Sequence, residues 1–75
     1  MINIEIMLVH SIIFDNKLFT ANSARSWLKI HNYKPIKHVD KTLNYLRYRI
    51  RDPAMFKSFV TKEITPGIKI VFGII

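Results

Sequence analysis

The segment TANSARSWLKIH, residues 20–31, is the one place in this 75-residue chain where apolar residues recur at helical spacing. The shared face of this predicted helix contains residues three and four positions apart: Ala21, Ala24, Trp27, Leu28 and His31. Thr20 is placed to cap the first turn with its hydroxyl group. Asn32 tolerates the left-handed conformation at a helix end, and Pro35 prevents continuation. The sequence therefore predicts a single helix over residues 20–31.

On both sides of this helix, the residue patterns are typical of strands. The clearest alternation lies in residues 43–51, where Leu46, Tyr48 and Ile50 fall on one face. The dipeptide Pro66-Gly67 favours a type II turn and therefore a hairpin near the C-terminus. The predicted strands cover these ranges: 1–14, 36–40, 43–51, 58–64 and 68–72.

The order strand, helix and four further strands predicts an α+β fold, with one helix packed on a four- or five-stranded, mostly antiparallel sheet. Residues 1–75 are expected to form a single domain, because a chain of this length has one core at most. Residues 1–9 either lengthen the first strand or form an arm that adds a strand to a second copy. A homo-oligomer through residues 1–9 is therefore one open expectation.

Composition narrows the class of protein. The chain has no cysteine, so it forms neither a disulfide nor a thiolate metal site. Apolar residues make up 49% of it despite a formal charge of +7, which favours an interface covered by a partner. No apolar run reaches the length of about 20 residues that a membrane span needs. The N-terminal segment lacks the positive charge of a secretory signal, so we do not expect secretion.

Positive charge is concentrated between residues 25 and 51, here called the basic stretch. It contains eight basic side chains and one acid, Asp40, which accounts for the whole formal charge of +7. A local excess of this kind favours a partner that carries carboxylates or phosphates.

Within the basic stretch, Arg47, Arg49 and Arg51 alternate along the predicted strand at about 6.5–7 Å, with Tyr45 on the same face. These three residues are called the strand arginines. Their planar side chains could bind phosphates, with Tyr45 and the nearby Tyr33 stacking on bases. They could instead dock an acidic protein or form a solvated face, and all three interpretations stay open. Further candidate binding residues lie before the strand: Arg25, Lys29, Lys34 and Lys37.

Catalytic and metal-binding patterns are missing from the sequence. The serines lack a visible His–Asp set, and two glycines cannot build a phosphate-binding loop. His10, His31 and His38 lack a third metal ligand, and His31 is expected to bond a backbone carbonyl near the helix end. Asp40 and Asn44 flank a turn and are expected to bond their own backbone, and Asp40 could also pair with Arg47 or Lys41. We therefore expect no enzyme activity, no metal and no cofactor.

From about residue 10 the order of motifs resembles a small uncharacterised module of tailed phages and large DNA viruses. The motifs are HSIIFD, then FTANSARSWLKIHNYKP, then VDKTLNYLRYRIRDP, then FKSFVTKEITPGIKIVFG. The matching positions are Trp27, Leu28, His31, Asp40, Asn44, Arg47, Arg49, Phe59, Thr61, Gly67 and Gly73. Asn32 departs from the usual glycine, and Val60 departs from a common basic residue.

The resemblance implies a minor structural or minor capsid protein of a virion, located in the virion or the host cytoplasm, with a larger viral or assembly protein as its partner. Together with the charge, it leads us to expect a non-enzymatic basic binding module that docks through the strand arginines. The alternatives are a nucleic-acid-binding protein that uses the arginine and tyrosine face, and a small inhibitor-type protein binder.

Overall fold

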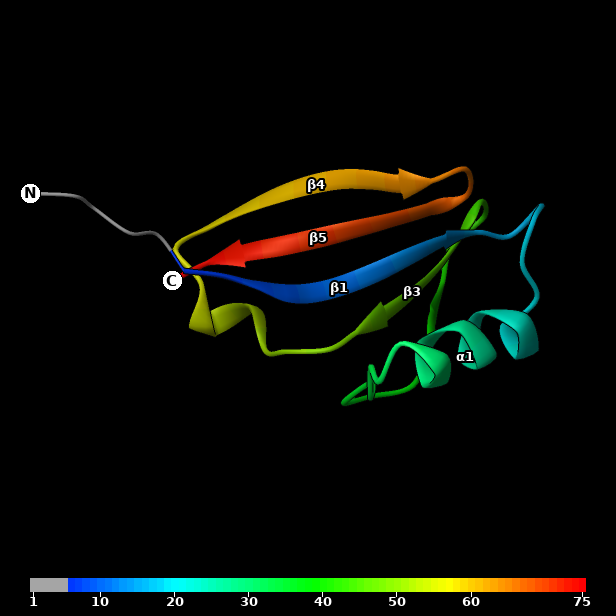
Figure 1. The fold of residues 1–75 in the computed structure, drawn as a ribbon, viewed down its shortest axis with the longest axis horizontal. Helices are drawn as coiled ribbons and strands as arrows, with labels where there is room; N and C mark the ends of the chain where they lie inside the picture. Colours follow the sequence, from blue (N-terminus) through cyan, green and yellow to red (C-terminus); the bar gives the residue numbers. More distant parts are fainter. Residues whose placement is uncertain (1–5) are drawn as a thin grey trace, which may run out of the picture.

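The computed structural model describes residues 6–75 and has one α-helix against a five-stranded sheet (Figure 1). The elements in chain order are β1 (Met7–Asp15), α1 (Ala21–Ile30), β2 (Asp40–Lys41), β3 (Tyr45–Arg49), the 3₁₀ turn η1 (Pro53–Met55), β4 (Ser58–Thr65) and β5 (Ile68–Ile74). The predicted α+β class and the order of elements are confirmed.

The first strand is the centre of the sheet. The spatial order is β2-β3-β1-β5-β4, and all neighbouring strands are antiparallel. Phe14 lies opposite Leu46 of β3 on one side and opposite Ile68 of β5 on the other. Met7 pairs with Ile74, so residues 7–9 lengthen β1 within this chain. Residues 1–5, which include the rest of the predicted arm, lie outside the described residues.

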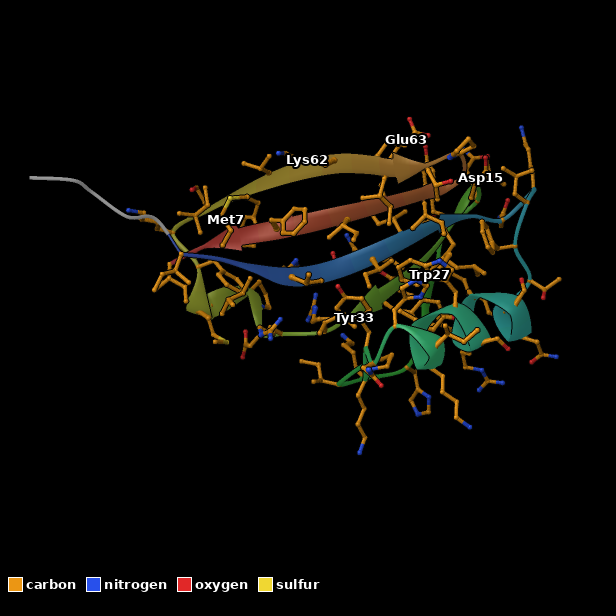
Figure 2. All side chains as sticks on the ribbon, viewed as in Figure 1. Met7, Asp15, Trp27, Tyr33, Lys62 and Glu63 are labelled. Atoms are coloured by element: carbon orange, nitrogen blue, oxygen red, sulfur yellow. The ribbon has the colours of Figure 1, made fainter. Side chains whose placement is uncertain are left out.

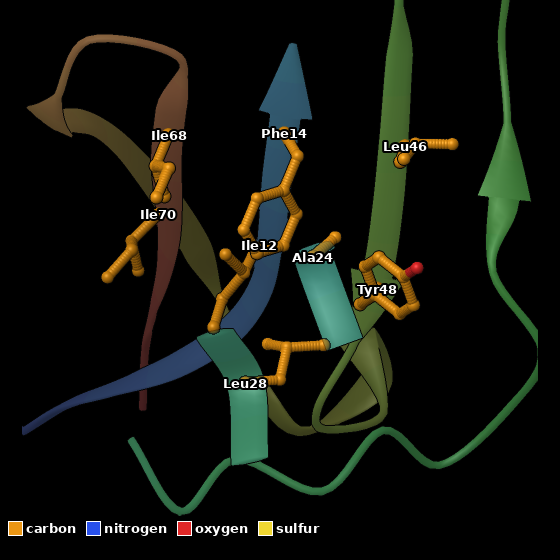
Figure 3. Close-up of a cluster of buried hydrophobic side chains, with 8 residues drawn as sticks. All are labelled: Ile12, Phe14, Ala24, Leu28, Leu46, Tyr48, Ile68 and Ile70. Atoms are coloured by element: carbon orange, nitrogen blue, oxygen red, sulfur yellow. The ribbon is translucent and has the colours of Figure 1, made fainter. Parts of the chain in front are cut away.

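The core lies between α1 and one face of the sheet, where the buried side chains come from β1, β3, β5 and the helix (Figure 3). Phe14 is its centre: its ring makes edge contacts with Phe19, Trp27 and Tyr48 at centroid distances of 5.1–5.7 Å. Burying a side chain of this kind contributes about 1.5–3 kcal/mol. The predicted inward face of Leu46, Tyr48 and Ile50 is confirmed.

Local chemistry sets both ends of α1. Thr20 Oγ1 accepts the backbone N–H of Ser23 at 3.1 Å, and Ser23 Oγ accepts the Thr20 N–H at 2.9 Å. These two reciprocal hydrogen bonds form a capping box. Only the bond accepted by the Thr20 hydroxyl group was predicted from the sequence. Asn32 has φ 61°, as predicted for the residue that ends the helix. The core-facing positions Ala24 and Leu28 are buried.

Two predicted strands are shorter than expected. In the region after the helix, only Asp40–Lys41 forms a strand. Residues 36–39 do not join the sheet, because they make a single backbone hydrogen bond to β3, in which Ile36 N–H donates to Arg49 O at 2.9 Å. β3 ends at Arg49, level with Ser11 of β1, and the pairing of β1 with β5 shifts register at His10, the next residue along β1. The N–H groups of Ile50 and Arg51 then both donate to His10 O.

Candidate functional site

The strand arginines do not form one free row. Arg47 and Arg49 lie on the sheet face opposite the helix, but Arg47 Nη2 is 2.7 Å from Asp40 Oδ2 in an exposed ion pair. Arg51 lies beyond the end of β3, and its Nη1 donates to Val9 O at 2.7 Å. Arg49 is thus the one strand arginine whose side chain makes no hydrogen bond or ion pair with another described residue. The Asp40–Arg47 pair is one of the two pairings that the sequence predicted.

Tyr45 lies, as predicted, on the same face as Arg47. This is the sheet face opposite the helix, here called the open face. The Tyr45 ring already has a neighbour there. Lys69 Nζ from β5 lies 5.7 Å from the centroid of the Tyr45 ring, within the range of a cation–π contact. Stacking of an incoming base on Tyr45 would compete with this lysine. The open sheet face is therefore a weaker binding surface than the sequence pattern suggested.

A different group of basic residues gathers where α1 meets the segment that follows it. The first hollow there has a volume of about 430 Å³. Its lining residues are Arg25, Leu28, Lys29, Asn32, Tyr33, Lys34 and Pro35. The chain reverses at Asn32, and Tyr33 N–H donates to Leu28 O at 2.8 Å. This reversal brings Lys34 beside the outer face of the helix.

The second hollow has a volume of about 340 Å³ and lies between α1, β3 and the segment before β2. Its lining residues are Ala21, Arg25, Pro35, Lys37, His38, Val39, Lys41 and Tyr48. Arg25 and Pro35 line both hollows, so the two hollows adjoin. A smaller recess adjoins the second hollow at Lys37 and His38, and its lining also includes Arg49 and the ion pair Arg47–Asp40.

We call the five cations that line the two hollows the basic surface: Arg25, Lys29, Lys34, Lys37 and Lys41. Neither hollow is lined by an acid, and within residues 6–75 the one ion pair is Arg47–Asp40, so none of these five side chains forms an ion pair with a described carboxylate. Four of the five were candidates from the sequence. Lys41 was missed as a site residue, although its place inside the basic stretch was a usable signal.

Tyr48 lines the second hollow and carries no charge. Burial raises the pKa of Tyr48, and the nearby Arg25 opposes this shift in part. The protonated Tyr48 hydroxyl group donates to Ala21 O at 3.4 Å. Arg25 forms no ion pair with a described acid, and its Nη2 donates to Asn22 Oδ1 at 3.2 Å. The second hollow thus combines the cations Arg25, Lys37 and Lys41 with the neutral side chain of Tyr48.

Trp27 and His31 stack next to Tyr33, the one aromatic residue that lines the first hollow. The Trp27 ring stacks on His31 with centroids 3.9 Å apart, and it is parallel to Tyr33 within 5° at 6.1 Å. Figure 2 shows Trp27 between the helix and the sheet and Tyr33 beside the end of the helix. His31 Nδ1 lies 2.8 Å from Trp27 O, which confirms the expected bond to a backbone carbonyl. The His31 side chain is nevertheless exposed and does not enter the core.

Metal-binding side chains do not cluster in the described part of the chain. No cluster of three His, Asp or Glu side chains there could hold a metal ion. His10 lies on the open sheet face against Phe56 and Phe59, and both its ring nitrogens are buried without a hydrogen-bond partner. Residues 6–75 also contain no helix with the length and apolar character that crossing a bilayer requires.

Comparison with known proteins finds no matching protein family, no matching curated protein and no matching solved structure.

Proposed function

We propose that this protein is a non-enzymatic binding module whose basic surface contacts the phosphate groups of nucleic acid. The observation that carries the proposal is the gathering of five cations around two adjoining hollows that no acid lines. Unopposed cations concentrate the positive potential over these hollows, and a phosphate polymer gains affinity by releasing counterions there. The basic surface takes the role that the sequence assigned to the strand arginines, because two of those three already have partners within the chain.

The resemblance to a module of tailed phages and large DNA viruses supports a setting for this binding. In that setting the protein is a minor structural component of a viral particle, seated against a larger assembly protein and in contact with packaged nucleic acid. Exposed cations around two adjoining hollows suit a flexible phosphate chain better than a flat acidic protein surface, because a chain can follow both hollows. We therefore place nucleic acid ahead of an acidic protein as the partner of the basic surface.

The proposal predicts a steep salt dependence that local charge removal reduces. In the double variant Lys37→Gln, Lys41→Gln, we expect weaker binding and a log–log salt slope smaller by about 2, because each lost phosphate contact lowers the slope by about 1. The measurement is fluorescence anisotropy of a labelled oligonucleotide at several salt concentrations, with the wild-type protein as reference.

The matched control is the double variant Lys17→Gln, Lys57→Gln, which removes the same net charge from exposed lysines outside both hollows. We expect this control to bind nearly as the wild type does. Equal loss of affinity in the two double variants would mean that net charge alone drives binding and would overturn the assignment of the basic surface. Absence of any binding by the wild-type protein would overturn the proposed function itself.

A further inference from the structure

The first hollow has a lining that phosphate contact alone does not explain. Tyr33 and Pro35 form its apolar wall above the buried Leu28, while Arg25, Lys29 and Lys34 supply cations. The hollow is open to solvent, and its volume of about 430 Å³ leaves room for one flat ring system to lie against its wall. A group that suits this lining has a flat apolar part and a negative charge directly beside it.

Tyr33 is held in a position suited to stacking. Its backbone N–H is bonded to Leu28 O at 2.8 Å, and the preceding Asn32 has a left-handed conformation that directs the chain back over the helix. The ring is half-buried and parallel to the Trp27 ring within 5°. A ring held in place before binding loses little conformational entropy when a ligand stacks on it.

We propose that the first hollow binds one unpaired nucleobase of a single-stranded nucleic acid, stacked on Tyr33, with the adjacent phosphates on Lys29 and Lys34. Asn32 also lines the hollow, and its side-chain amide offers both a donor and an acceptor to the edge of the base. Bases in a duplex are stacked on each other and cannot enter the hollow, so the inference selects single strands. It rests on the proposed function and adds the kind of nucleic acid.

The first experiment changes the ligand and leaves the protein intact. Wild-type protein is titrated with single-stranded oligothymidylate, with a strand of equal length that has abasic sites, and with a duplex. A further titration with single-stranded oligouridylate tests whether the protein binds RNA. We expect at least one of the two base-bearing single strands to bind about 5- to 150-fold tighter than the abasic strand, which corresponds to about 1–3 kcal/mol for one stacked base. We also expect emission of Trp27, the only tryptophan, to change with the base-bearing strand.

The second experiment changes Tyr33. Tyr33→Leu removes the stacking ring, and we expect it to lose the preference for single strands with bases while its affinity for the duplex stays as in the wild type. Tyr33→Phe keeps the ring and is expected to keep the preference. Circular dichroism checks that both variants fold, and the abasic comparison on the wild type stands independently of them.

The outcomes separate this inference from the proposed function. Equal binding of the base-bearing, abasic and duplex ligands would overturn the base-binding hollow and leave the phosphate-binding surface in place. Retention of the single-strand preference in Tyr33→Leu would place the base elsewhere and overturn the inference. Failure of every nucleic acid to bind the wild type would overturn both.

Discussion

His10, at the bulge of β1, is half-buried, and its ring makes no hydrogen bond. Its ring centroid is 5.0 Å from that of Phe59 and 6.0 Å from that of Phe56, and neither ring nitrogen has a partner. Burial lowers the pKa of His10 below its usual 6.5, Arg49 and Arg47 lower it further, and Asp52 opposes them. The native fold therefore favours the neutral ring.

This lowered pKa predicts a loss of stability in mild acid. The unfolded chain binds a proton on His10 more readily than the folded chain does, so the contribution is fully present above the unfolded pKa of 6.5 and is lost as pH falls through the lower folded pKa. Urea denaturation from about pH 7.5 to about pH 5, on both sides of the usual histidine pKa, measures the change. His10→Leu should reduce it while His31 and His38 remain, and an unchanged pH dependence in that variant would contradict the assignment.

Among elements, β5 depends on a glycine at the point where another segment folds over it. Phe56 follows η1 and lies directly on Gly73, where a Cβ atom would come within 2.2 Å of the Phe56 ring. Phe56 is buried at this contact. Such an approach fastens the segment between β3 and β4 onto the open face of the sheet, near His10.

Gly73→Ala should destabilise the protein by about 1–3 kcal/mol, because an added methyl group forces the packed ring to move. Chemical denaturation measures the free energy of unfolding. In a Phe56→Ala background the same substitution should cost clearly less, since the obstructing ring is absent and the two changes are coupled. An equal cost in both backgrounds would show that the strand conformation, and not the ring, excludes the side chain.

For the whole molecule, the sheet has two unequal edges. β2 has only two residues, whereas all eight residues of β4 are exposed and its outer edge pairs with no described strand. Figure 1 shows β4 on the side of the sheet away from α1. A long free edge favours pairing with other chains unless charge or shape prevents it.

Lys62, in the middle of β4, is placed to discourage such pairing. Lys62→Val should increase self-association in sedimentation velocity experiments, because it replaces an edge charge with a β-branched apolar residue. Lys57→Val, just before β4, is the matched control and should change association less. Monomeric Lys62→Val at the same concentrations would contradict this role for the charge.

The local pattern of residues in the sequence was sufficient to predict the class of fold. The helix, the inward face of Leu46 and Tyr48, and the hairpin turn at Gly67 could all be predicted, because side-chain periodicity and backbone preference act within a few residues. Gly67 has φ 87°, as a type II turn requires. The prediction failed in part for residues 36–40, because a strand exists only where a neighbouring strand offers hydrogen bonds.

The candidate site could be predicted only as a local excess of charge. Which cations stay free depended on distant partners: Asp40 neutralises Arg47, and Val9 O holds Arg51 across 42 positions of the chain. The two hollows likewise need the helix to lie on the sheet and the chain to reverse at Asn32. The sequence by itself determined the helix, the strands and the total charge, because these depend on residue type and spacing. Only the tertiary structure decided the sheet order, the bulge at His10 and the grouping of Arg25 with Lys34 and Lys41, because these depend on contacts between residues far apart in the chain.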